Sequence, residues 1–369
     1  MKKALIAAAV AGAFAAPYAM AADGPSVNIY MPMALTFGDT TTQIGDAVTK
    51  QDSDRVSDGG GARIMFSWSD TLNNGMTLHV YQSFGNLANS EGEFGDNNVT
   101  NRNSYIGLSG DFGSVRMGTN EHFIEGDAII DGYGGDWATG GEGLNHMTLG
   151  QSGFAFVRRD SNSIWWNSND YNGLSFKAAY IGGPAADAAN RADPEGMQLG
   201  VKYTSGALSV GFNQGSYDDY AADGANDATT GVAGSEVEAN QFNAAYDFGS
   251  FAVKATMIDM EQTNHAGAGT GLAARGYSVN FTMPVASGRV IVNIGSISDQ
   301  DVTAAGVTTA SNDSGRESYD VGYQHDFSAN TYGFVRYDNR EDGVNFSDAA
   351  GADGSSETEV VMLGIVFSY

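Results

Sequence analysis

A short-period alternation of apolar and polar residues is the feature that most constrains how this chain folds. In the segment 62–69, Ile64 and Phe66 lie on one face of an extended backbone, and Arg63 and Ser67 lie on the other. The same alternation returns in the segments 174–180, 201–203, 290–294 and 361–369. Beyond residue 21 no stretch approaches the roughly 18 consecutive apolar residues of a membrane-spanning helix. The pattern predicts strands with one apolar and one polar face, which a soluble sandwich and a barrel would share.

The connections between these strands favour one of the two architectures. Seven short links occupy residues 69–75, 110–113, 169–173, 204–206, 247–250, 284–288 and 326–331. Eight long polar connections alternate with them, at residues 38–61, 85–99, 120–157, 182–195, 215–235, 259–273, 298–314 and 339–358. A sandwich has no reason to sort its loops by length, whereas an outer-membrane barrel has short periplasmic turns and long extracellular loops. We therefore expect an all-β chain, a transmembrane antiparallel up-and-down β-barrel of sixteen strands.

The first residues are interpreted as a signal peptide. Lys2 and Lys3 form a positive start, residues 4–16 are apolar, and residues 19–21 read Ala-Met-Ala, a small-residue cleavage site. We expect residues 1–21 to be removed and residues 22–369 to form a single barrel domain. Because lipid cannot hydrogen-bond a free strand edge, the first strand, near residues 27–37, should pair with the last.

The composition excludes several classes of function. The chain has no cysteine, so a disulfide scaffold and a thiolate metal site are excluded. It has 44 acidic and 18 basic residues and a formal charge of −26, which argues against nucleic acid as a partner because phosphate repels acids. The five histidines have no metal-ligand spacing, and no nucleophile motif is present. We expect no enzyme activity, no cofactor and no bound metal.

Four segments resemble the Gram-negative general porins, a family of sixteen-stranded trimeric diffusion channels. Residues 101–118, which read N-R-N-S-Y-I-G-L-S-G-D-F-G-S-V-R-M-G, are similar to the family's characteristic hairpin. Residues 61–66 resemble its second strand, and residues 159–166 with 171–174 resemble its sixth strand and the following turn. The last three residues, Phe367-Ser368-Tyr369, resemble its terminal-aromatic insertion signal, although the family usually ends in Phe.

The resemblance implies a location, partners and a constriction. It implies the outer membrane of a Gram-negative bacterium, a homotrimer, and contact with lipid, lipopolysaccharide and the insertion machinery, which reads Phe367 and Tyr369. In this family the third long loop folds into the lumen and narrows it. Here that loop is the longest connection, residues 120–157, which contains six acidic residues and no lysine or arginine.

Two oppositely charged sides of the constriction follow from the resemblance. The acidic loop side is expected at Asp127, Asp131, Asp136 and Glu142, and the basic wall at Arg63, Arg102, Arg116 and Arg159. By parity Arg63, Arg116 and Arg159 lie on the polar faces of their strands. Arg102 instead shares its parity with Ile106 and Leu108, which leaves its direction open.

Two functions are compatible with these residues. We expect a water-filled channel for passive diffusion of ions and small hydrophilic solutes, with a mild cation preference because acids outnumber bases in the loops. The alternative is a substrate-selective outer-membrane channel with an internal binding site for a specific small solute. Aromatic residues near strand ends, Tyr81 among them, are interpreted as interfacial girdles. Trp165 is the one inward aromatic residue expected to be able to stack on a ligand.

Overall fold

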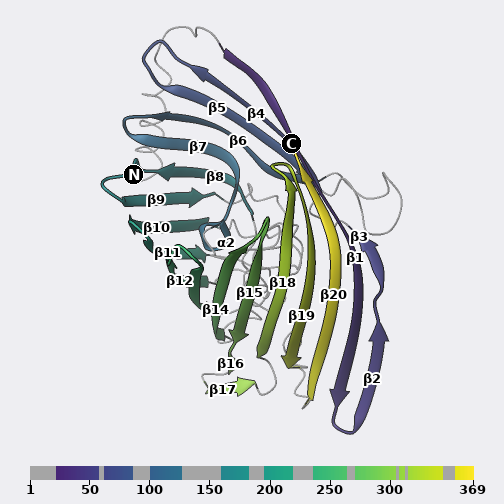
Figure 1. Cartoon of the computed structure of the whole chain (residues 1–369). Helices are drawn as coiled ribbons and strands as arrows, with labels where there is room; N and C mark the ends of the chain where they lie inside the picture. The colour runs from purple at the N-terminus through teal and green to yellow at the C-terminus, as the bar shows by residue number, and fades with distance from the viewer. Residues whose placement is uncertain are drawn as a thin grey trace.

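Sixteen antiparallel strands follow one another in chain order around a closed wall (Figure 1). The computed structural model describes residues 22–57, 62–85, 100–126, 159–182, 195–218, 236–263, 271–304, 307–311, 315–343 and 354–369. The wall strands are β1 (Ala22–Ile44), β4 (Arg63–Thr71), β5 (Thr77–Gly85), β6 (Thr100–Gly110), β7 (Gly113–Glu121), β8 (Arg159–Asn167), β9 (Leu174–Ile181), β10 (Glu195–Ser205), β11 (Leu208–Asp218), β12 (Glu236–Asp247), β13 (Ala252–Thr263), β14 (Gly271–Val285), β15 (Gly288–Ile297), β18 (Arg316–Ser328), β19 (Thr331–Gly343) and β20 (Gly354–Ser368). The predicted all-β barrel of sixteen strands is confirmed.

The first and last strands close the wall. Tyr30 pairs with Ser368 at one end of the β1–β20 ladder, and Ile44 pairs with Gly354 at the other. The backbone amide of Tyr369 donates to the carbonyl of Ile29 at 2.8 Å, and the amide of Ile29 donates to the carbonyl of Tyr369 at 2.7 Å. No strand edge remains open in this circuit, as a lipid environment requires.

Short turns and long connections alternate as the sequence predicts. Each of the seven short links joins two neighbouring wall strands, and the one between β6 and β7 leaves only two residues between them. There Gly113 has a φ of +93°, and a Cβ atom on it would lie 2.1 Å from the carbonyl oxygen of Asn167, so only glycine fits.

Two of the long connections contain short strands that the sequence did not predict. β2 (Ala47–Asp52) and β3 (Arg55–Ser57) pair back onto β1, which extends to Ile44 and past the predicted end of the first strand. β16 (Gln300–Ala304) and β17 (Val307–Ser311) pair with each other, and β16 also pairs with β14. Each of these segments is short and carries a single valine among mostly polar residues, so it lacks the sustained alternation by which the other strands were recognised.

Residues alternate between the lumen and the outer surface along each wall strand. On β12 Val237 and Gln241 are buried toward the lumen, whereas Phe242 is 49 % exposed on the outer face. Apolar residues exposed on the outer face of other strands include Leu35, Phe66, Ile106, Val210, Val279, Ile294, Val321, Val335 and Leu363. An apolar outer band and a polar interior are what a bilayer-spanning barrel requires.

The single helix of the described residues, α2 (Phe123–Gly126), lies inside the ring of strands and contacts β10 and β11 (Figure 1). No helix in the described ranges has the length and apolar character needed to cross a membrane. The predicted signal peptide, residues 1–21, lies outside the described residues.

Candidate functional site

Aromatic rings hold two arginines of the expected basic wall. The guanidinium of Arg63 on β4 lies 4.7 Å from the ring centroid of Tyr30 on β1. The guanidinium of Arg116 on β7 lies 5.2 Å from the ring of Tyr105 and 5.6 Å from that of Trp165. Cations over aromatic faces are attracted by the ring quadrupole, so both guanidiniums are held in defined positions on the inner wall.

A β-bulge decides the direction of Arg102. Gln82 pairs with Ser104 and Phe84 pairs with Asn101, so β6 carries an extra residue beside β5 at this point. The extra residue reverses the alternation and turns Arg102 to the inner face, where it is 7 % exposed. A Cβ atom on inward-facing Gly85 would lie 2.6 Å from Cδ of Arg102, so the absence of a side chain at Gly85 makes room for this arginine.

The other expected constriction residues are described only in part or not at all. Arg159 begins β8, and its backbone pairs with that of Glu121 on β7, but its side chain lies outside the description. The four acids of the expected loop side, Asp127, Asp131, Asp136 and Glu142, also lie outside the described residues.

The start of the third long connection is anchored inside the barrel by wall side chains. The amide of Phe123 donates to Oε1 of Gln198 on β10 at 2.8 Å. Nε2 of Gln241 on β12 donates to the carbonyl of Ile124 at 2.7 Å. The amide of Ile124 donates to Nδ1 of His122 at 3.1 Å, so His122 caps the short helix. The buried backbone amides of Phe123 and Ile124 and the carbonyl of Ile124 therefore all have hydrogen-bond partners.

An apolar cluster on the inner wall surrounds this anchor. Phe123 and Ile124 pack with buried wall residues of β8 to β15, which are Trp165, Ala179, Ile181, Tyr217, Val237, Ala239, Ile258, Met260, Leu272, Ala274 and Ile297. The rings of Phe123 and Trp165 meet edge to face, with centroids 4.5 Å apart. Nζ of Lys177 lies 5.3 Å from the ring centroid of Phe123.

This packing tests the expectation for Trp165. The indole does face inward, but Phe123 covers it, it is fully buried, and its Nε1 donates to Oγ of Ser163 at 2.5 Å. The prediction that Trp165 offers a surface for ligand stacking is wrong for the described conformation. Tyr81 also differs from its expected girdle role, because it stacks on Tyr105 above the inner wall with centroids 5.3 Å apart.

His122 is a residue that the sequence interpretation passed over. It is buried and stacks on Tyr217 of β11 with ring centroids 5.6 Å apart. Burial lowers the pKa of His122 from its usual 6.5 to about 3, because the charged form would lose its hydration. The imidazole is therefore neutral at physiological pH, which suits Nδ1 as the acceptor for the Ile124 amide. A lone histidine between Glu121 and Phe123 gives no sequence signal for this role.

A second cluster of arginines lies on β18 and β19 and was also missed. Nη2 of Arg336 on β19 lies 2.5 Å from Oδ2 of Asp338, and its Nε lies 3.5 Å from Oδ1 of Asp320. Arg316 and Arg340 both pair with Asp342, the latter at 3.0 Å. The alternation of Arg336, Asp338 and Arg340 with Val335 and Tyr337 could have placed these charges inward. Three arginines and three aspartates balance within this cluster.

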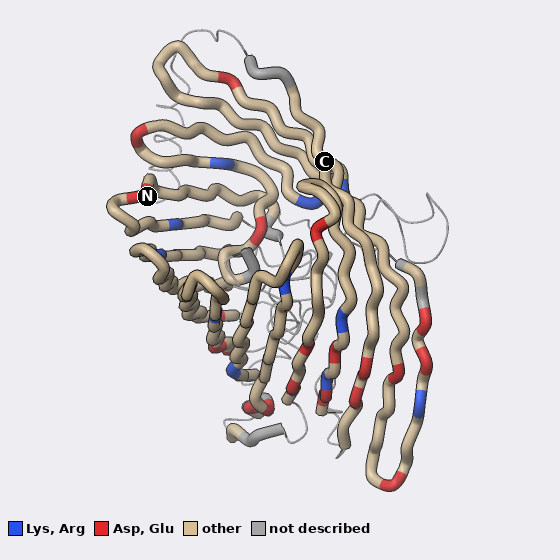
Figure 2. Tube along the Cα trace, in the orientation of Figure 1, with Lys and Arg blue, Asp and Glu red and all other residues tan. Residues whose placement is uncertain are grey.

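Acidic residues are frequent where the strands run toward the long connections, and basic residues lie mainly along the strands (Figure 2). In the described ranges no group of three or more histidine, aspartate or glutamate side chains is arranged to hold a metal ion. The lumen thus carries fixed charges, stacked rings and amide groups, which can orient ions and polar solutes in transit.

Comparisons with known proteins agree with this architecture. The sequence profile of the Gram-negative porins matches residues 6–343. A monosaccharide porin of Halomonas sp. and the major outer membrane protein of Halomonas elongata are each 25 % identical over 231 residues, which is 60 % of this chain and 61 % of the relative. The chain thus spans about three fifths of the length of these curated relatives.

Solved structures share the fold at low sequence identity. The loop-L8 deletion variant of OmpT from Vibrio cholerae has a TM-score of 0.65 at 17 % identity, covering 95 % of this chain and 100 % of that one. The anion-selective porin from Comamonas acidovorans has a TM-score of 0.65 at 17 % identity, covering 94 % and 100 %. OmpF of Salmonella typhi in complex with daunomycin has a TM-score of 0.62 at 15 % identity, covering 94 % and 97 %.

The family profile covers nearly the whole sequence, and the described strands close into a sixteen-stranded barrel. This chain therefore belongs to the Gram-negative porin family and is a protein of the outer membrane of a Gram-negative bacterium.

Proposed function

We propose that this porin is a non-enzymatic channel for passive diffusion of ions and small hydrophilic solutes, and that the third long connection narrows it. The observation that carries the proposal is the anchoring of α2 inside the barrel, where Gln198 and Gln241 bind its backbone and Trp165 packs on Phe123. A sixteen-stranded barrel encloses an aqueous lumen, so an inward loop is what limits solute size.

We further propose a mild preference for cations. Arginines on the early strands favour anions, but the long connection at residues 120–157 carries six acids and no lysine or arginine, and the arginines around Arg336 are balanced by aspartates. Fixed negative charge at the mouth and constriction raises the local cation concentration. Salt weakens this effect, because the screening length falls from about 30 Å at 0.01 M to about 3 Å at 1 M.

A planar-bilayer recording with a KCl gradient tests both proposals. We expect stepwise conductance, a reversal potential of cation sign at low salt, and a shift toward zero at 1 M. Neutralising Asp131, Asp136 and Glu142 together should weaken the preference. A matched control neutralises the outward-facing acids Glu238, Glu261 and Glu341, and this variant should change the cation preference less. A chloride-selective sign at low salt would mean that the arginine wall governs permeation, and an absence of conductance would overturn the channel itself.

The second candidate is a substrate-selective channel. The similarity to a monosaccharide porin of Halomonas supports it, together with the aromatic and hydroxyl groups that line the inner wall beside Tyr81. Flux through a general channel rises linearly with the solute gradient, whereas an internal site makes flux saturate. Liposome swelling with a series of sugars separates the two.

Assembly and export complete the proposal. We propose a homotrimer after removal of residues 1–21, with residues 22–369 as one barrel domain, inserted through Phe367 and Tyr369 and in contact with lipopolysaccharide and lipid. Crosslinking of the purified protein tests the trimer, and N-terminal sequencing of the mature protein tests the cleavage site.

A further inference from the structure

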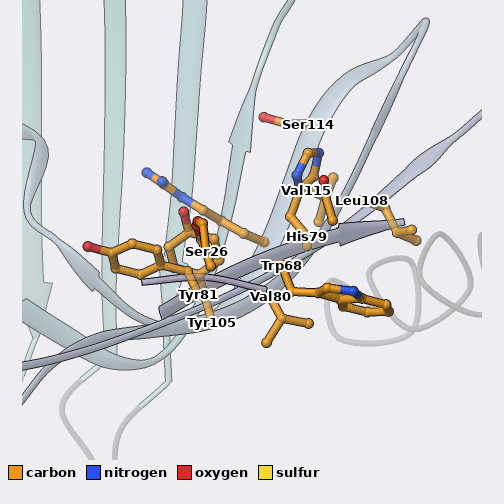
Figure 3. A pocket seen from close by; sticks show the side chains of 13 residues that line it. Ser26, Trp68, His79, Val80, Tyr81, Tyr105, Leu108, Ser114 and Val115 are labelled. Carbon is orange, nitrogen blue, oxygen red and sulfur yellow. The ribbon is translucent and has the colours of Figure 1, made fainter. Parts of the chain in front are cut away.

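A recess opens on the inner side of the early strands, close to the short turns (Figure 3). Its volume is about 520 Å³, and thirteen residues of β1 and β4 to β7 line it. Trp68 and Val80 project from one side of the strands and His79 from the other, the side of the lumen (Figure 3). A volume of this size suits a small-molecule ligand.

Hydroxyl groups and one permanent charge line the lumenal side of the recess. Ser26, Ser67, Ser69 and Ser114 contribute hydroxyls, and Tyr81 and Tyr105 contribute a stacked pair of phenol rings. Arg116 is the one permanently charged residue among the thirteen, and none of them is an aspartate or glutamate. In a chain with a formal charge of −26, this lining is a local site of opposite sign.

Arg116 is positioned to act as the anchor of this site. Its guanidinium lies 5.2 Å from the ring of Tyr105 and 5.6 Å from the ring of Trp165, and these contacts fix its direction before any solute arrives. Among the described residues it has no hydrogen bond or ion pair, and its Nε is buried. A guanidinium with free N–H groups binds a planar carboxylate through two parallel hydrogen bonds.

The hydroxyl lining specifies the rest of the ligand. Ser69 and Ser114 make no side-chain hydrogen bond to other described residues, so each can donate to and accept from a solute hydroxyl. His79 contributes an imidazole whose Nε2 lies 2.7 Å from Oγ of Ser109. A single arginine balances a single negative charge, which favours a monocarboxylate over a doubly charged phosphate.

We propose that this recess is a binding site for small hydroxylated monocarboxylates as they pass through the channel. The proposal rests on the channel function proposed above and adds a solute class to it. Arg116 binds the carboxylate near the short-turn end of the lumen, and the serines bind the hydroxyl groups. Together these contacts make the flux of such solutes saturable. Solutes that lack either group pass without saturation.

Gluconate is the probe for this site, with butyrate and glucose as partial ligands. Its flux is measured in liposomes, and its binding is followed by the reduction that it causes in the KCl current. Both readouts are normalised to the KCl conductance of each variant. We expect saturation with gluconate alone. Arg116→Gln should raise the gluconate concentration at half-saturation by about tenfold or more, which is the loss of affinity expected when a charged hydrogen bond is removed. Ser69→Ala with Ser114→Ala should reduce the advantage of gluconate over butyrate.

A matched control and separate readouts keep the outcomes distinct. Lys202→Gln removes another inward base, on β10 and outside the recess, and should retain saturation by gluconate. A conducting channel through which gluconate passes in proportion to its gradient would overturn the recess and leave the channel standing. Saturation by inorganic phosphate or glucose but not by gluconate would overturn the proposed solute class. A protein that never conducts would overturn the channel function itself.

Discussion

The ring of Phe123 stands edge-on to the indole of Trp165, with centroids 4.5 Å apart and planes 88° apart. The first ring belongs to the long connection after β7, and the second belongs to wall strand β8. Because the guanidinium of Arg116 lies 5.6 Å from the ring of Trp165, this one indole links the inward loop to the basic wall.

Phe123→Ala should release the start of the loop from the wall. The loss of a buried aromatic side chain costs up to about 3–5 kcal/mol, and here the cost falls on the attachment of residues 122–126. We expect faster amide exchange in that segment and a noisier open-channel current. Phe242→Ala, on the outer face of β12, is the control and should change neither. Unchanged exchange in Phe123→Ala would show that other contacts hold the loop.

Acid should weaken the same attachment through His122. Its pKa is lowered to about 3 in the folded chain, so between pH 6.5 and 3 the detached segment binds a proton that the attached one does not. The free energy of attachment is therefore at its full value above pH 6.5. As the pH falls from 6.5 toward 3, it decreases by about 1.4 kcal/mol per pH unit. The weakening is measured by amide exchange of residues 122–126 at pH 7, 5.5 and 4.5. The exchange rates are corrected for the intrinsic rate at each pH.

His122→Asn is the matched control for the acid effect. Asparagine can still accept from the amide of Ile124 as a helix cap, but it does not titrate. The pH dependence of exchange should flatten in this variant. An identical slope in both proteins would assign the effect to other groups.

Arg336→Met should destabilise the barrel strongly. The substitution leaves the buried carboxylates of Asp320 and Asp338 without this cation, and the loss of one partner of a buried ion pair costs about 3–5 kcal/mol. The comparison variant is Arg289→Met, since Arg289 hydrogen-bonds the neutral amide of Gln324. Arg289→Met should lower the free energy of unfolding by only about 1 kcal/mol. Urea unfolding in detergent measures both, and equal losses would contradict an ion-pair role for Arg336.

Deletion of residues 367–369 should prevent assembly in the membrane. It removes the pairing of Phe367 with Met31 and the two backbone hydrogen bonds between Tyr369 and Ile29. An open edge in lipid costs several kcal/mol for each unpaired backbone group, so we expect degraded periplasmic protein. Tyr369→Phe keeps the terminal aromatic residue and should assemble normally. Heat-modifiable trimers in the outer membrane after the deletion would refute the role of this terminus.

Much of the fold could be predicted because it depends on local patterns. Alternation such as Ile64 and Phe66 against Arg63 and Ser67 reflects the two-residue period of a strand, and the sorting of connections by length reflects the two sides of a membrane. The inward directions of Arg63 and Arg116 followed from the same parity. The short strands β2, β3, β16 and β17 could not be predicted in the same way, because each is too short and polar to show the alternation.

The sequence by itself determined the strand count, the order of short and long connections and the inward direction of Arg63 and Arg116. Only the tertiary structure decided the direction of Arg102, since a bulge opposite Gln82 and Phe84 reverses parity without a local signal. It likewise decided that Trp165 is covered, that His122 is neutral and buried, and that Tyr81 and Arg116 border one recess. These properties depend on residues distant in sequence that meet on neighbouring strands or through the inward loop, and a repeating pattern along one strand carries no information about what packs against it.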